Sequence, residues 1–85
     1  MKHNQHPISL QTRMRFEAAR HVLTALIGYA GSRAVTDPDL AARGDWATRG
    51  DDWARQLHTL SPRDDKAVDR ILTVDAAFLP GLAQR

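Results

Sequence analysis

The chain has 85 residues, with twelve lysines and arginines against ten acidic residues and a formal net charge of +2. A chain of this length forms one domain, which buries only about two-thirds of the surface that the unfolded chain exposes. The sequence contains no cysteine, which excludes disulfides and thiolate zinc sites as sources of stability. Stability must then come from well-packed helices or from self-association.

The sequence shows no targeting or membrane segment. Residues 1–7 are polar and no apolar signal region follows them, so we expect a disordered tail at 1–7 and a single helical domain at 8–85. The longest apolar stretch, residues 22–30, is interrupted by Thr24 and falls far short of the roughly 20 residues that span a bilayer. Together with the lack of cysteine, these features favour a cytoplasmic protein with no membrane partner.

A first helix is predicted from Ser9, a typical N-cap, to about Gly31. At about 100° per residue, its apolar residues form two stripes. The first stripe holds Phe16, Ala19, Leu23, Leu26, Ile27 and Ala30, and the second holds Met14, Ala18, Val22, Ala25 and Tyr29. Together they cover roughly 220°, about twice the arc of a one-sided surface helix. The pattern therefore predicts a central helix that is buried on two sides.

A second helix is predicted to start at Thr36-Asp37-Pro38, an oxygen-bearing cap followed by proline. An internal near-repeat follows, Gly44-Asp45-Trp46-Ala47 and Gly50-Asp51-Asp52-Trp53-Ala54, with the tryptophans seven residues apart. The helix either breaks at a glycine, with Asp51 or Asp52 capping a new helix, or continues to Leu60. Acid-first pairs at i,i+4 favour the continuous helix. These pairs are Asp39–Arg43, Asp45–Arg49 and Asp51–Arg55.

The second helix also carries the two tryptophans of the chain, seven residues apart on one face. That face consists of Trp46, Gly50, Trp53, Leu57 and Leu60, at alternating spacings of four and three. Packing against the first helix is the expected role of this face. Two large aromatic side chains on a small domain also suit an interface anchor.

A third helix is predicted from Ser61-Pro62-Arg63-Asp64, with Ser61 as the cap, to a stop at Leu79-Pro80-Gly81. Its apolar stripe holds Ala67, Ile71, Val74 and Phe78, flanked by Val68, Leu72 and Leu79. Asp75 falls inside this apolar arc, where a lone carboxylate is unfavourable. We expect the helix to break at Thr73, with Thr73 or Asp75 as a cap; the alternative is a buried pair with Arg or His.

Catalytic machinery is lacking. The chain has one glutamate, no cysteine, and three serines at the ends of predicted helices, so we expect no enzyme, no catalytic residue and no cofactor. Glu17 and His21 are interpreted as a solvated i,i+4 pair. Met1-Lys2-His3 could supply four nitrogens to Cu(II) or Ni(II), but one histidine in a tail is a weak signal, and we expect no functional metal site.

The sequence thus predicts an all-α, three-helix antiparallel bundle that acts as a protein–protein interaction module, a regulatory, inhibitory or accessory subunit. The expected partner-binding residues are Trp46, Trp53, Leu57, Arg13 and Arg20. Leu40, Ala47 and Ala54 widen the apolar face of the second helix, which favours a homodimer with a tryptophan at the contact. The alternative is a DNA-binding regulator that contacts phosphates through Arg13, Arg15 and Arg20, although five aspartates lie in residues 36–60.

Overall fold

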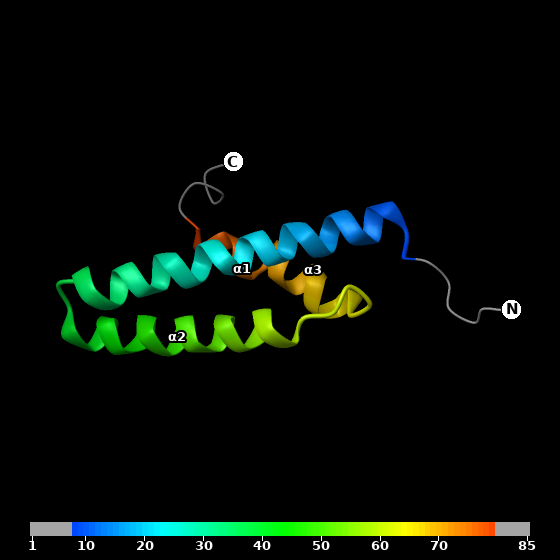
Figure 1. Ribbon diagram of the computed structural model, residues 1–85. Helices are drawn as coiled ribbons and strands as arrows, with labels where there is room; N and C mark the ends of the chain where they lie inside the picture. The colour runs from blue at the N-terminus through cyan, green and yellow to red at the C-terminus, as the bar shows by residue number, and fades with distance from the viewer. Residues whose placement is uncertain (1–7, 80–85) are drawn as a thin grey trace, which may run out of the picture.

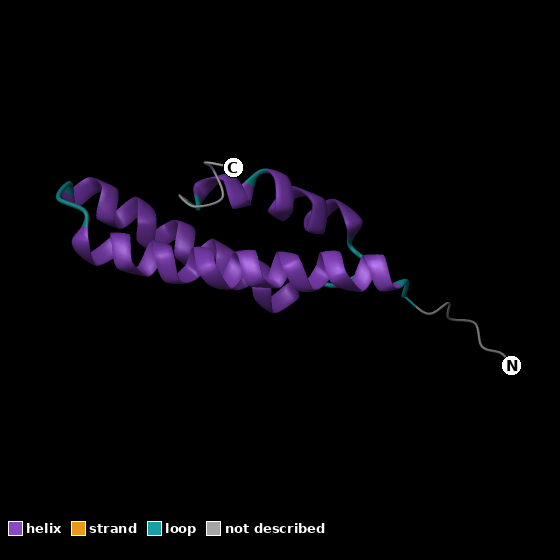
Figure 2. Ribbon diagram, turned by 90° about the horizontal axis from the view of Figure 1, so that it is seen from above, coloured by secondary structure: helices purple, strands orange, loops and turns teal. Residues whose placement is uncertain are grey.

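The computed structural model of the protein describes residues 8–79 as a small all-α bundle without strands (Figures 1 and 2). Its elements are α1 (Leu10–Thr36), α2 (Leu40–Thr59), α3 (Asp65–Thr73) and the 3-10 helix η1 (Asp75–Phe78). α2 runs antiparallel to α1, and α3 returns in the direction of α1. The predicted tail, the Met1-Lys2-His3 nitrogens and the predicted stop at Pro80-Gly81 lie outside the described residues.

The start of α1 is confirmed, but its predicted end was wrong. The Ser9 Oγ caps the helix by accepting the Thr12 N–H at 3.1 Å. The helix continues past Gly31 to Thr36, where the Asp37 N–H donates to the Arg33 carbonyl at 3.0 Å. A glycine ends a helix when it adopts the left-handed conformation, and no glycine among the described residues does so.

α1 is the central helix, since it contacts α2, α3 and η1. Its first apolar stripe supplies most of the core, which consists of Ala19, Leu23, Leu26, Ala30, Trp53, Val68 and Ile71. The second stripe was predicted to be buried and is only partly so: Val22 and Tyr29 are half-buried, whereas Met14, Ala18 and Ala25 are exposed. Within residues 8–79 the helix is thus not enclosed on two sides, because its neighbours pack mainly against the first stripe and reach only Val22 and Tyr29 of the second.

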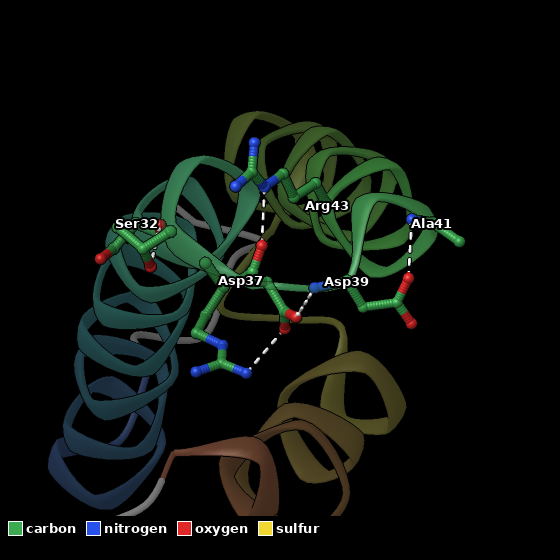
Figure 3. A network of polar contacts seen from close by, with 7 residues as sticks. Ser32, Asp37, Asp39, Ala41 and Arg43 are labelled. Atoms are coloured by element: carbon green, nitrogen blue, oxygen red, sulfur yellow. Dashed lines mark hydrogen bonds and ion pairs between the residues drawn. The ribbon is translucent and has the colours of Figure 1, made fainter.

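The turn between α1 and α2 is organised by Asp37, whose residue surface is only 6% exposed. Its carboxylate accepts the Arg33 Nη2–H at 2.7 Å and the Asp39 N–H at 3.0 Å (Figure 3). The Arg43 Nε–H donates to the Asp37 carbonyl at 2.7 Å. The Asp39 N–H and the charge of Arg33 hold the pKa of Asp37 below its ordinary value, against the opposing effect of burial.

The cap of α2 is Asp39, not Thr36 or Asp37, and the helix begins at Leu40 rather than at Pro38. The Asp39 carboxylate accepts the Ala41 N–H at 3.0 Å. Asp37 cannot serve as this cap because it is the C-cap of α1 and its carboxylate is already bound to Arg33 and to the backbone of Asp39.

The continuous α2 is confirmed, since the helix passes through Gly44 and Gly50 without a break. The three predicted i,i+4 ion pairs do not form, so that part of the prediction was wrong. Arg43 bonds instead to the Asp37 carbonyl, and the Arg49 guanidinium lies 4.6 Å from the centroid of the Phe78 ring. Arg55 pairs instead with Asp52. The aromatic face and its packing on α1 therefore stabilise the helix in place of those pairs.

α3 begins at Asp65, later than predicted, because its N-cap is Asp64 and not Ser61. The Asp64 carboxylate accepts the Ala67 N–H at 3.1 Å, whereas the Ser61 Oγ accepts the Arg63 N–H within the preceding turn. The expected break is confirmed: α3 ends at Thr73 and η1 follows. Neither expected cap forms, because η1 has no side-chain cap and Asp75 is buried as its first residue.

The break also exposes part of the predicted apolar stripe. Ile71 and Val68 are buried, but Val74 is 54% and Phe78 36% exposed, since the regular repeat of α3 ends at Thr73 and does not extend to these two residues. Within residues 8–79, no helix combines the length and the apolar character needed to cross a bilayer.

Candidate functional site

Within the described residues, 8–79, other elements cover only one side of the α1–α2 hairpin. α3 and η1 lie behind the hairpin as it is drawn in Figure 1 and to one side of it in Figure 2. Two contacts fix that side: Arg15 Nη2 lies 3.2 Å from Asp69 Oδ1, and the Trp53 and Phe78 ring centroids are 5.5 Å apart. We call the opposite side of the hairpin, which no other element of residues 8–79 covers, the open face.

The helical repeat shows which residues belong to the open face. At about 100° per residue, Ile27 lies about 120° around α1 from Arg15, and Ala54 lies about 100° around α2 from Trp53. On this basis the apolar residues of the open face are the half-buried Phe16, Ile27 and Leu57 and the exposed Gly31, Ala47 and Ala54. The open face therefore combines three large apolar side chains with small residues.

The two helices approach each other closely beneath the open face. A Cβ atom placed on Gly50 would lie 3.3 Å from the Ala30 Cβ, whereas one placed on Gly31 would meet no atom within 4 Å. Gly50 thus permits the close contact of α1 with α2, and Gly31 leaves open space at the surface. This arrangement can receive another helix, because small residues let helix backbones approach.

Basic side chains from α1 border the open face. Arg13 and Arg20 are both exposed. The Arg20 guanidinium lies 5.8 Å from the centroid of the Phe16 ring and 3.7 Å from the Glu17 carboxylate. Exposed pairs of this kind contribute at most about 1 kcal/mol to stability, so this edge remains available for a partner.

The five residues predicted to bind a partner do not form one surface. Leu57, Arg13 and Arg20 lie on or beside the open face. Trp53 is only 4% exposed and faces η1. Trp46 is half-buried, with its ring centroid 5.3 Å from that of Tyr29.

Sequence reasoning did not identify Phe16, Ile27 and Gly31 as surface residues. The available signal was the width of the apolar arc of α1, which exceeds what two neighbouring helices cover. That arc was interpreted as evidence of burial, whereas in the structure Ile27 and Phe16 are only half-buried.

Within residues 8–79, no group of three His, Cys, Asp or Glu side chains is placed to hold a metal ion. Comparison with protein-family models, with curated proteins and with solved structures finds no match to this chain.

Proposed function

We propose that the protein acts through protein–protein binding, as a regulatory, inhibitory or accessory subunit in the cytoplasm, and that the open face is its contact surface. The observation that carries the proposal is the pair of exposed α2 alanines, Ala47 and Ala54, beside the half-buried Ile27 and Leu57. Apolar side chains grouped on one side of a small domain are typical of interaction surfaces. The sequence has one glutamate, no cysteine and three serines at the ends of predicted helices, which supports a role without catalysis or a cofactor.

The occupant that we propose for the open face is a second copy of the chain. The 20 residues of α2 extend for about 30 Å, and two adjacent helices are about 20 Å wide. A face of about 600 Å² per copy then buries about 1,200 Å² in total, the lower end of the range for stable interfaces. A single foreign helix would cover about half of that area.

Two hairpins packed with their open faces together give a four-helix bundle. In this dimer the second copy covers the side of the hairpin opposite to α3. An antiparallel two-fold arrangement sets the basic ends of the two α1 helices, each with Arg13 and Arg20, at opposite ends of the dimer. The contact then involves Leu57 and the small residues. It does not involve Trp53, since that side chain is buried and faces η1.

Light scattering coupled to size exclusion tests the dimer. The wild-type chain should elute with about twice its 9.5 kDa mass. Ala54→Glu, which adds a charge to the open face, should yield a monomer with an unchanged helical circular dichroism spectrum. The matched control is Ala25→Glu, an exposed α1 alanine away from the open face, which should remain dimeric. A wild-type monomer at high concentration, or a monomeric Ala25→Glu with a dimeric Ala54→Glu, contradicts the proposal.

A DNA-binding regulator is the second candidate, favoured by the exposed Arg13 and Arg20 along one edge of α1. Arg15, the third arginine considered, is engaged with Asp69. Exposed acids on α2, including Asp45 and Asp51, oppose phosphate binding. A salt titration separates the two candidates, because phosphate contacts give a steep negative slope of log K against log salt. Tight binding with such a slope, lost in Arg13→Gln/Arg20→Gln, would favour DNA.

A further inference from the structure

A cleft separates α2 from α3 and η1 on the covered side of the hairpin. One hollow in it has a volume of about 140 Å³ and is lined by Arg49, Trp53, Gln56, Arg70, Asp75 and Phe78, together with Asp52. A wider hollow of about 500 Å³ shares Asp52, Gln56 and Arg70 with it. One water molecule needs only about 10–15 Å³ on this scale, so the cleft has room for a small organic molecule.

A buried carboxylate lines the narrower hollow. Asp75 is only 6% exposed, and its Oδ2 is buried with no hydrogen-bond donor among residues 8–79. Buried carboxylates in folded proteins are normally paired or hydrogen-bonded, because removing the charge from water is costly. The position of Asp75 beside a hollow therefore indicates a donor group supplied from outside the fold.

Two arginines line the same hollow, and neither has a carboxylate partner in the part of the chain that the structure describes. Neither Arg49 nor Arg70 forms an ion pair within residues 8–79, whereas the Asp52 carboxylate is bound to Arg55. Arg49 is held over the Phe78 ring, 4.6 Å from its centroid. Among residues 8–79, the hollow thus presents one unpaired negative and two unpaired positive groups, together with the apolar surfaces of Trp53 and Phe78.

We propose that this hollow binds a small zwitterion of the α-amino acid type. The ammonium group of the ligand would donate to Asp75, its carboxylate would accept from Arg70 and Arg49, and an apolar side chain would lie against Trp53 and Phe78. A ligand with only a positive charge meets the repulsion of the two arginines, and one with only a negative charge leaves Asp75 unpaired. A zwitterion satisfies both sets of groups.

NMR titration of the ¹⁵N-labelled protein with L-leucine, N-acetyl-L-leucine and L-leucinamide tests the proposal. The N-acetyl compound lacks the ammonium group, and the amide lacks the carboxylate. L-leucine should shift the indole N–H signal of Trp53 and the backbone signals of Asp75 and Phe78, with little effect on the indole of Trp46. Each analogue should bind at least about 10-fold more weakly, since each loses a charge-assisted hydrogen bond.

Variants test the two ends of the ligand separately. Asp75→Asn should weaken L-leucine binding at least about 10-fold and should not weaken binding of the anionic N-acetyl-L-leucine, which no longer meets a like charge at position 75. Arg70→Gln should likewise weaken L-leucine binding and should not weaken binding of the cationic L-leucinamide. Asp51→Asn, on the exposed side of α2, is the control for net charge and should bind like the wild type. Equal affinities for the three compounds in the wild type, or no shift at Trp53 and Asp75, would overturn the proposal whether or not the variants fold.

Discussion

The molecule contains two buried aspartates with equal exposure, 6%, in opposite circumstances. Asp37, in the α1–α2 turn, accepts hydrogen bonds from the Arg33 side chain and the Asp39 backbone. Asp75, at the junction of α3 and η1, has a buried oxygen that accepts none within residues 8–79. The aromatic surroundings differ as well: Trp46 lies near Arg33 in the first region, and Trp53 packs on Phe78 in the second.

Asp37 therefore has a structural role, whereas the Asp75 carboxylate makes no hydrogen bond through Oδ2 that would stabilise the described fold. The hydrogen bonds of Asp37 join the last turn of α1 to the first turn of α2, so they compensate its burial within the chain. The burial of Asp75 lowers stability, and no hydrogen bond to Oδ2 among residues 8–79 compensates for it. Residues of this kind are typical of binding sites. The comparison therefore predicts opposite effects of substitution in the two regions.

The largest expected effect is the loss of Trp53. Trp53→Ala should destabilise the protein by about 3–5 kcal/mol, because Trp53 is a buried core residue. Trp46→Ala should cost roughly half as much, since Trp46 is only half-buried and the cost scales with buried apolar area. Urea denaturation followed by circular dichroism at 222 nm measures both values. Equal costs would show that the two regions contribute equally to the core.

Asp37→Asn should lower the melting temperature, and the loss should depend on pH. Because the folded-state pKa of Asp37 lies below its ordinary value, its ionised form stabilises the fold fully above the ordinary aspartate pKa. That contribution is lost as the pH falls through the ordinary value to the lower folded-state value. Thermal melts at neutral pH and in acid should therefore differ more for the wild type than for Asp37→Asn. Parallel pH profiles would exclude this role.

Asp75→Asn should leave the stability unchanged or raise it, and Asp75→Leu should raise it by about 1 kcal/mol, because either change removes an unpaired buried charge. The sign distinguishes Asp75 from Asp37. Both variants are compared with the wild type by urea denaturation at neutral pH. Destabilisation by more than about 1 kcal/mol would indicate that Arg49 or Arg70 pairs with Asp75 in solution.

The smallest effects are expected at the two glycines of α2, of which Gly44 lies near the Asp37 region and Gly50 lies between the tryptophans. Gly44→Ala should stabilise the protein by about 0.5–1 kcal/mol, since alanine is the better helix former and no atom lies within 4 Å of the added Cβ. Gly50→Ala should gain less, because its Cβ would lie 3.3 Å from that of Ala30. Chemical denaturation measures the free energy of unfolding of both variants. Equal gains would show that α1 moves to accommodate the methyl group.

Local signals in the sequence were sufficient for the helical architecture. A serine followed by a long apolar repeat predicted the start of α1 at Ser9. The acid-first i,i+4 spacings predicted a continuous α2 despite its glycines, although the pairs themselves do not form. The misplaced aspartate at position 75 predicted the break after Thr73. These features depend on residues within a few turns of one another, so they can be predicted from residue spacing and residue type.

Tertiary contacts alone decided which polar groups pair and which faces are covered. The sequence places an acid four residues before Arg43 and before Arg49. In the fold, Arg43 bonds instead to the Asp37 carbonyl, and Arg49 lies over the ring of Phe78. Helical periodicity showed that α1 has a wide apolar arc, but only the packing of α3 against one side of the hairpin left the opposite side open. Burial and pairing depend on the sum of long-range contacts around a residue, so the sequence did not show that Asp37 is bonded to Arg33 and that Asp75 Oδ2 is buried without a donor among residues 8–79.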